Sequence, residues 1–308
     1  MADEIFDVVI TGVGPAGIQA GIHAARKKTR VLLLGRIENS ALYGAHIENY
    51  AFVDGVTEGR TMLEVGLAQV RRFGAEVRAE DVLRITAGDD GLFGLDLESG
   101  RTIQSRSLIL CMGVAKKKLA VPGEKELAGR GVSYCVDCDA NFFRNATVAV
   151  VGNRSAAVDG ALTLLDYAAT VYLVARKIEV SEELRARLAA SDVQVREGTW
   201  IKEIKGENAV TGIDLDSGES LAVDGIFIEL GSKGALELAT QIGVALDTET
   251  FKYIDTNRRQ ETNIPGIYAA GDIVGPPYQM AKAVGEGCVA GMEAATYARR
   301  QKRSSAAG

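Results

Sequence analysis

Several features that would place a chain in a familiar class are absent from this sequence or scarce in it. Four cysteines in 308 residues are too few for a disulfide framework. Residues 1–4 are acidic where a secretory signal would be basic. A net charge of −6 disfavours a general nucleic-acid-binding protein. The sequence therefore predicts a cytoplasmic protein with no nucleic-acid partner.

Long hydrophobic runs are also missing. The longest uncharged stretch, residues 8–25, contains Gly12, Gly14, Pro15 and Gly17. This pattern predicts a strand, a tight turn and a helix instead of a membrane span. We therefore expect no membrane partner.

The composition that remains is that of an ordinary globular protein, with 47% apolar and 25% charged residues. A chain of 308 residues suits two domains, each large enough to bury a core of its own. The 35 glycines are a mild excess, which is expected where tight strand-to-helix turns approach a cofactor.

Two of the cysteines, Cys135 and Cys138, form a C-x-x-C pair. In a cytosolic α/β chain this spacing indicates redox chemistry or half of a zinc site. A tetrahedral zinc site would need further ligands, and the other candidates stand alone in the sequence: His23, His46, Cys111 and Cys288. We therefore favour redox chemistry and expect no metal site.

The N-terminus predicts a dinucleotide-binding unit. Residues 5–10 are predicted to form a buried strand, and Gly12, Gly14 and Gly17 then complete a G-x-G-x-x-G turn. A helix to about residue 28 and a second strand at 31–34 follow. The acidic residue that often binds a ribose at the end of the second strand is replaced by Gly35 and Arg36.

A second unit of the same kind begins near residue 146, after an alternating β-meander at 74–113 and a polar, turn-rich linker. The chain then closes with a strand, a Gly-Asp turn and a long helix rich in small residues, which we expect to fray from Arg299. The sequence thus predicts an α/β protein with two Rossmann-like three-layer domains, the second inserted in the first. The predicted boundaries are 1–115 with 236–308 for the outer domain, and 116–235 for the inserted domain.

Four segments together resemble the low-molecular-weight thioredoxin reductases over essentially the whole chain. GVGPAGIQAGIHAAR (12–26) is similar to the family's FAD-pyrophosphate loop, and IENYAFVDG (47–55) to a segment near the flavin, although its Pro-Gly has become Ala51-Phe52. GRGVSYCVDCDANFFR (129–144) resembles the redox segment, and IPGIYAAGDI (264–273) the second FAD motif. The resemblance implies an FAD-dependent thioredoxin-disulfide reductase that acts on thioredoxin and forms a homodimer.

The resemblance also assigns roles within the redox segment. Cys138 is the thiol that faces the flavin, Cys135 is the thiol that attacks the substrate disulfide, and Asp139 is the acid or base that handles the thiol proton. Asp137 lies between the two cysteines and is unusual there. It either tunes the pair, because a neighbouring carboxylate raises thiol pKa values, or is a solvated loop residue.

For FAD, the resemblance places the glycine turn on the pyrophosphate and Asp272 on the ribityl chain. Gln279, Met280 and Ala281 begin a helix whose N-terminus would face the flavin pyrimidine. The full set of expected FAD-binding residues is Gly12, Gly14, Pro15, Ala16, Gly17, Gly35, Arg36, Asn49, Gly113, Gly271, Asp272, Gln279, Met280 and Ala281.

The inserted domain departs from the family pattern at its NADPH site. Its loop has Arg154 in place of the middle glycine, where backbone must approach the pyrophosphate. The family's basic H-R-R-x-x-x-R run has become Ala175-Arg176-Lys177, with Ser181 in place of the last arginine. Both halves of the site are altered while both FAD motifs and the C-x-x-C pair are kept, so we interpret the NADPH site as abandoned.

Electrons must then come from another donor, as in the ferredoxin-dependent flavin thioredoxin reductases, which this pattern resembles. Two lysine-rich runs, 26–28 and 116–118, are candidate docking sites for an acidic ferredoxin. Two alternatives stay open. One is an NAD(P)H-dependent thioredoxin reductase with a modified nucleotide loop, and the other is a non-catalytic flavin redox sensor.

Overall fold

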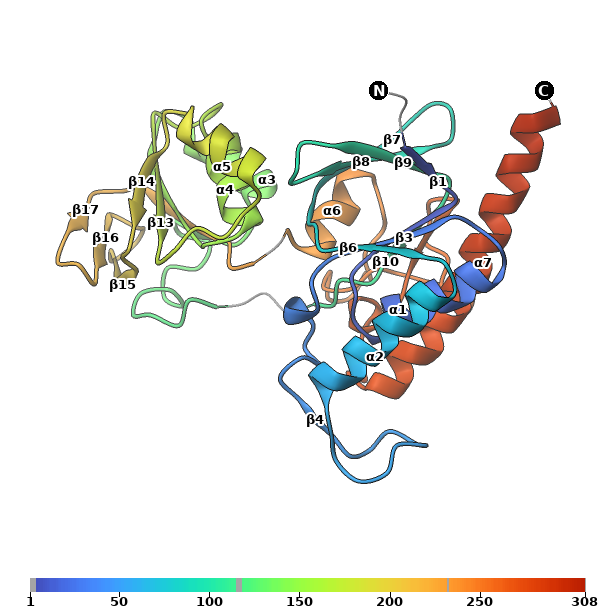
Figure 1. Ribbon diagram of the computed structural model, residues 1–308. Helices are drawn as coiled ribbons and strands as arrows, with labels where there is room; N and C mark the ends of the chain where they lie inside the picture. Colours follow the sequence, from blue (N-terminus) through green and yellow to red (C-terminus); the bar gives the residue numbers. More distant parts are fainter. Residues whose placement is uncertain (1–3, 115–117, 232, 308) are drawn as a thin grey trace. The chain divides into compact units, whose positions relative to one another are not determined.

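In the computed structural model, which describes residues 4–114, 118–231 and 233–307, the chain divides into two compact units (Figure 1). The first, which we call the outer unit, comprises Met1–Leu97, Arg101–Ala115 and Gly234–Gly308. The second, which we call the inserted unit, comprises Glu98–Gly100 and Lys116–Lys233.

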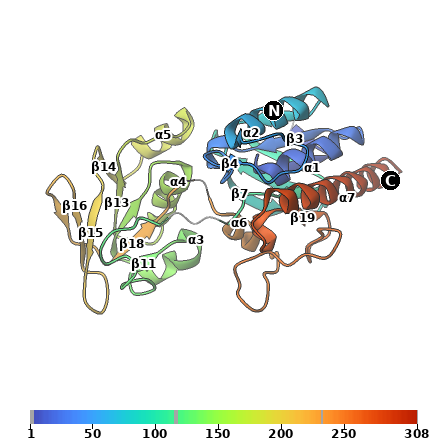
Figure 2. The same cartoon turned by 90° about the horizontal axis from the view of Figure 1, so that it is seen from below.

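The outer unit is built on a five-stranded parallel sheet in the order β19-β10-β2-β3-β6. Three helices lie on one face and a four-stranded sheet, order β1-β9-β8-β7, lies on the other. The strands of the parallel sheet are β2 (Val8–Thr11), β3 (Val31–Leu34), β6 (Glu76–Arg78), β10 (Leu108–Leu110) and β19 (Ile267–Ala269). The helices are α1 (Pro15–Arg26), α2 (Gly59–Arg72) and α7 (Met280–Ala307), and α1 and α7 lie side by side (Figures 1 and 2).

The four-stranded sheet on the opposite face is mainly an antiparallel meander. Its strands are β1 (Glu4–Phe6), β7 (Val82–Ala87), β8 (Phe93–Leu97) and β9 (Thr102–Ser105). Helix α6 (Ala235–Gln241) packs against β7, and short elements complete the unit: η1 (Ile37–Asn39), β4 (His46–Ile47), β5 (Thr57–Glu58) and η3 (Asp272–Val274).

The apolar runs of the central strands follow from this layering. Along β2 and β3, alternate residues such as Val8 and Leu33 pack toward the helices, whereas Val9 and Leu32 pack toward the meander. A parallel sheet covered on both faces needs apolar side chains at every position. The predicted three-layer α/β architecture is confirmed.

The inserted unit repeats the three layers. Its parallel sheet has the order β11-β18-β12-β13-β14: β11 (Val132–Ser133), β12 (Thr147–Val151), β13 (Thr170–Ala175), β14 (Gln194–Glu197) and β18 (Gly225–Ile228). On one face lie α3 (Val136–Asp139), η2 (Ala140–Phe143), α4 (Ser155–Leu164) and α5 (Glu182–Ala189) (Figures 1 and 2). On the other lies an antiparallel sheet of β15 (Ile201–Lys205), β16 (Gly212–Leu215) and β17 (Ser220–Leu221).

Several expected element boundaries are wrong. The strand expected at 5–10 is two strands that divide at Asp7, because β1 pairs with the meander and β2 with the parallel sheet. Helix α1 ends at Arg26, and Lys28 beyond it has a left-handed backbone (φ 59°) that a helix cannot continue through. Helix α7 runs to Ala307, where we expected fraying from Arg299, because alanine and arginine favour the helix.

No helix within the described residues combines the length and the apolar character that crossing a bilayer requires.

Candidate active site

The first glycine turn joins β2 to α1 and leaves no space for side chains. A Cβ at Gly12 would lie 2.4 Å from the Cys111 carbonyl oxygen, and a Cβ at Gly17 would lie 1.9 Å from the Gly12 carbonyl oxygen. Gly12 also has a φ of 109°, which strains any other residue. Gly14 is the N-cap of α1 and supplies no capping side chain, and Pro15 follows it. The amides of this helix N-terminus therefore suit an anionic group such as a pyrophosphate.

The second FAD motif lies against this turn. A Cβ at Gly271 would be 3.0 Å from the Cβ of Ala16, and the Gly271 carbonyl accepts a hydrogen bond from Lys282 Nζ at 2.9 Å. Burial raises the pKa of the adjacent Asp272 carboxyl, and the Lys282 cation acts in the opposite direction. A partly buried carboxylate at this place can accept hydrogen bonds from hydroxyl groups of a cofactor.

The remaining predicted FAD residues gather at the same edge of the sheet. Asn49 Nδ2 donates to Gln279 Oε1 at 3.3 Å, which joins the IENY segment to the start of α7 at Met280 and Ala281. Gly35, at the end of β3, lies near Gly12, because a Cβ there would be 3.6 Å from the Gly12 Cα. Arg36 pairs with Asp81 at 2.9 Å, and Gly113 follows β10. The carboxyl edge of a parallel sheet is where such folds bind nucleotides, so the residues present fit FAD.

The redox segment lies in the inserted unit, where β11 leads into α3. Cys135 and Cys138 are joined by a disulfide bond, with their Cα atoms 5.3 Å apart. Cys135 is the N-cap of α3, and its Sγ accepts the Cys138 N–H at 3.2 Å. Cys135 is 7% exposed, whereas Cys138 is exposed.

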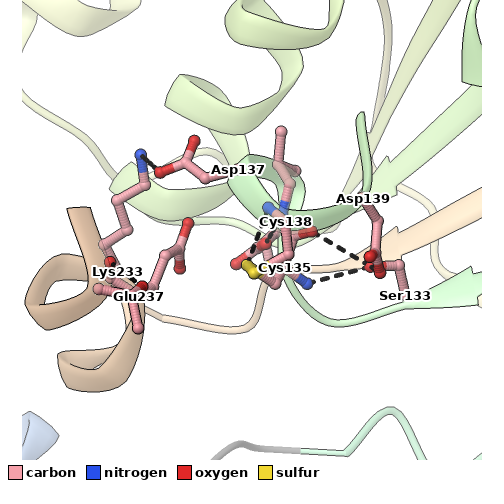
Figure 3. The surroundings of a disulfide bond; sticks show 10 residues. Ser133, Cys135, Asp137, Cys138, Asp139, Lys233 and Glu237 are labelled. Carbon is pink, nitrogen blue, oxygen red and sulfur yellow. Dashed lines mark hydrogen bonds and ion pairs between the residues drawn. A yellow bond between two sulfur atoms is a disulfide. The ribbon is translucent and has the colours of Figure 1, made fainter. Parts of the chain in front are cut away.

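Asp139 is held in place by a serine that sequence reasoning missed. The Ser133 hydroxyl donates to the Asp139 carboxylate at 2.6 Å and accepts the backbone N–H of Cys135 at 3.1 Å (Figure 3). The hydroxyl thus connects the expected proton-handling carboxylate to the backbone of the redox pair.

Asp137 faces a buried cation. Its carboxylate is 3.1 Å from Lys233 Nζ, on the side of the cysteine pair away from Asp139 (Figure 3). Neither Lys233 nor Glu229, whose carboxylate accepts the Val136 N–H at 3.2 Å, was found from the sequence. A glutamate at the end of the buried run GIFI was the available signal for Glu229; Lys233 had none.

The second nucleotide loop, between β12 and α4, is bonded to its own chain. Arg154 is the N-cap of α4, and the Ala156 N–H, two positions on, donates to the Gly231 carbonyl at 3.3 Å. A Cβ at Gly152 would lie 2.0 Å from the Glu229 carbonyl oxygen, so this glycine is required by packing alone.

The residues at the family's basic run are also engaged locally. Arg176 pairs with Asp216 at 3.0 Å and lies 5.9 Å over the Trp200 ring, and Lys177 pairs with Glu179 at 3.5 Å. Ser181 caps α5 by accepting the Leu184 N–H at 3.2 Å.

Among the described residues, no cluster of three or more histidine, cysteine or acidic side chains is arranged to hold a metal ion.

Two dinucleotide-type turns, of which the first has all three glycines, and a disulfide after a short strand define a class of redox enzyme. The chain belongs to the pyridine nucleotide-disulphide oxidoreductase family, whose model matches residues 6–301. The thioredoxin reductase of Listeria monocytogenes is 33% identical over 98% of this chain and 97% of that protein. A bifunctional thioredoxin reductase/thioredoxin of Mycobacterium leprae is 34% identical over 95% of this chain and 66% of that longer protein.

Two solved structures are also similar. The atypical thioredoxin reductase TRi of Desulfovibrio vulgaris Hildenborough has a TM-score of 0.80 and 33% identity, over 96% of this chain and 98% of that one. A ferredoxin-flavin thioredoxin reductase of Clostridium acetobutylicum has a TM-score of 0.68 and 31% identity, over 96% and 99%. These findings confirm the predicted class, an FAD-dependent disulfide oxidoreductase of the thioredoxin reductase type.

Proposed function

We propose that this enzyme reduces a thioredoxin disulfide through Cys135 and Cys138, with electrons that reach its FAD from a donor other than NAD(P)H, such as a ferredoxin. The single observation that carries the choice of donor is the second nucleotide loop, whose helix-start amide at Ala156 is bonded to Gly231. A dinucleotide pyrophosphate needs such amides at the start of a helix.

Three further contacts support the same proposal. Arg176 and Lys177 are paired with Asp216 and Glu179, so binding a 2′-phosphate would break existing ion pairs. The Ser181 hydroxyl holds the first turn of α5 and carries no charge for a phosphate.

The residues of the redox segment then have distinct roles. When bound, FAD would supply an electron pair to the disulfide, and it can itself be reduced in one-electron steps. In this proposal Cys138 receives the electron pair first, which its exposure supports, and Asp139, hydrogen-bonded to Ser133, takes up and returns the thiol proton. Cys135 is buried, so its attack on an external disulfide requires that this sulfur become exposed.

The lysine-rich runs support the donor proposal poorly. Lys116 and Lys117 lie outside the described residues. Residues 26–28 lie at the C-terminal end of α1, opposite the glycine turn, and a helix of 12 residues is about 18 Å long. An acidic donor that docked there would be remote from the flavin.

The resemblance adds a homodimer to the proposal, and the composition adds a cytoplasmic location. The competing proposal is an NAD(P)H-dependent reductase with a re-tuned loop.

The deciding experiment is anaerobic stopped-flow reduction of the yellow protein by NADPH, by NADH and by a reduced low-potential ferredoxin, with dithionite as the control for full bleaching. The altered loop and the altered basic run would each cost about 2 kcal/mol of binding free energy. Together they would weaken NADPH binding about a thousandfold. We expect fast bleaching by ferredoxin and slow, non-saturating bleaching by NADPH. Saturable bleaching within milliseconds at micromolar NADPH would restore the competing proposal. Full bleaching by any donor, with no transfer to oxidised thioredoxin, would favour the redox sensor.

A further inference from the structure

Lys233 is a buried cation that joins the redox segment to the helix beside it. Its Nζ lies 3.1 Å from Asp137 in α3 and 3.1 Å from Asp159 in α4, and its side chain is 3% exposed. A lysine in such surroundings needs counter-charges, because burying a lone ammonium group is costly. The two carboxylates supply them.

Reduction changes the charge next to this cluster. The S–S bond breaks, two electrons pass to the sulfurs, and each sulfur is left as a thiolate that takes up a proton according to pH. The Asp137 carboxylate, which directly precedes Cys138 in the chain, opposes negative charge on that sulfur. Its pairing with Lys233, seen in Figure 3, offsets this opposition and fixes the carboxylate on the side away from Asp139.

We propose that Lys233 is a positioning residue for the reduced pair, which acts through Asp137 to keep thiolate formation at Cys135 and Cys138 favourable. The proposal rests on the proposed function only in treating this pair as the redox centre. Among the described residues of the inserted unit, the charged groups bonded to this segment or to Lys233 include Asp137 and Asp139 from α3, Asp159 from α4, and Glu229 and Lys233 itself from the segment after β18. Of these five, Lys233 alone is a cation.

The test measures thiolate formation without any donor or thioredoxin. The holoprotein is reduced anaerobically with dithiothreitol, freed of reductant and alkylated with iodoacetamide across a range of pH. Modification is quantified on the peptide that holds Cys135 and Cys138, which separates it from Cys111 and Cys288. The variants are K233M, K233R, D137N and K233M/D137N.

We expect K233M to raise the midpoint pH of alkylation by about one unit, which slows alkylation about tenfold below the midpoint. K233R should keep the wild-type profile. D137N should change the profile little when Lys233 is present, and should restore it toward wild type in the K233M background. Such non-additivity is the signature of a direct coupling.

A wild-type profile for folded K233M would overturn the proposal, as would equal shifts from D137N in both backgrounds. If K233M does not fold, the D137N variant alone still tests the proposal. A fall of one full unit in the midpoint pH of alkylation of D137N would mean that Lys233 does not compensate the charge of Asp137 in the wild type, which contradicts the proposal. Because neither donor nor substrate is present, these outcomes are separate from those that test the proposed function.

Discussion

At the scale of single residues, Gly14 offers the clearest test of the expected FAD site, because a Cβ there would meet only the Ser40 side chain, at 3.3 Å, and no backbone atom. As the N-cap of α1, it places its backbone where a pyrophosphate would lie. We predict that Gly14→Arg yields a folded, colourless protein, because the side chain occupies the place of the phosphates. The measurement is flavin absorbance per chain after purification.

The matched control is Gly44→Arg. Gly44 is exposed and has open space where its Cβ would lie. This variant should keep its full flavin content. Equal flavin in both variants would remove the glycine turn from the FAD site.

The cysteine pair gives a second prediction at this scale. Cys135→Ser should keep its flavin and lose thioredoxin reduction by several orders of magnitude, because a hydroxyl cannot form the mixed disulfide. The assay is the rate of thiol appearance in oxidised thioredoxin, with chemically reduced enzyme as the electron source. Cys288→Ser, at an unpaired cysteine outside the redox segment, is the control and should be fully active. Turnover in the Cys135 variant would contradict the assigned roles.

The sequence could predict residues that belong to a short contiguous motif, such as Cys135, Cys138 and the first glycine turn. It could not predict Ser133 as the holder of Asp139, or Lys233 as the partner of Asp137. The contact of Lys233 with Asp137 joins segments far apart in the chain, and only the packing of β18 beside β11 and β12 brings them together.

At the scale of elements, the pair of helices α1 and α7 depends on glycine. A Cβ at Gly291 would lie 2.3 Å from the carbonyl oxygen of Ala20, a backbone atom that cannot move away without separating the helices. We predict that Gly291→Ala lowers the free energy of unfolding of the apoprotein by about 1–3 kcal/mol, the usual cost of overpacking. Urea unfolding measures it.

Gly285 in the same helix is the internal comparison. It is exposed, with no atom near the place of its Cβ. Gly285→Ala should raise the free energy of unfolding by up to about 1 kcal/mol, because alanine favours the helix. Stability changes in the same direction for both variants would show that the close contact of Gly291 with Ala20 does not decide the effect.

Elements were predictable where a continuous apolar run adjoins a glycine turn or the helix after it, as for β3 and β12. The division of the first strand at Asp7 was not, because Phe6 and Val8 look alike in the sequence and differ only in their partner sheets. Helix α2 was missed, although its buried residues Leu63, Leu67 and Val70 have helical spacing.

At the scale of the whole molecule, the division into two units predicts separable folding. A fragment of residues 116–233 has its own parallel sheet and its own apolar core. We predict that it unfolds cooperatively in urea, forms the Cys135–Cys138 disulfide and binds no FAD. Circular dichroism, thiol titration and absorbance measure these three properties. A fragment without a cooperative transition would show that the predicted inserted domain depends on the outer unit.

The discontinuity of the outer unit has a consequence for how the protein is made. The glycine turn at 12–17 leaves the ribosome early, but Gly271 and α7, which pack against it, are translated much later. The inserted unit, with its cysteine pair, is complete before either of them. A chain released before α7 therefore carries a redox-active pair and only half of the expected flavin site. In the cell, the yellow colour would be acquired only after α7 has been translated, and a stop before α7 would leave a colourless dithiol protein.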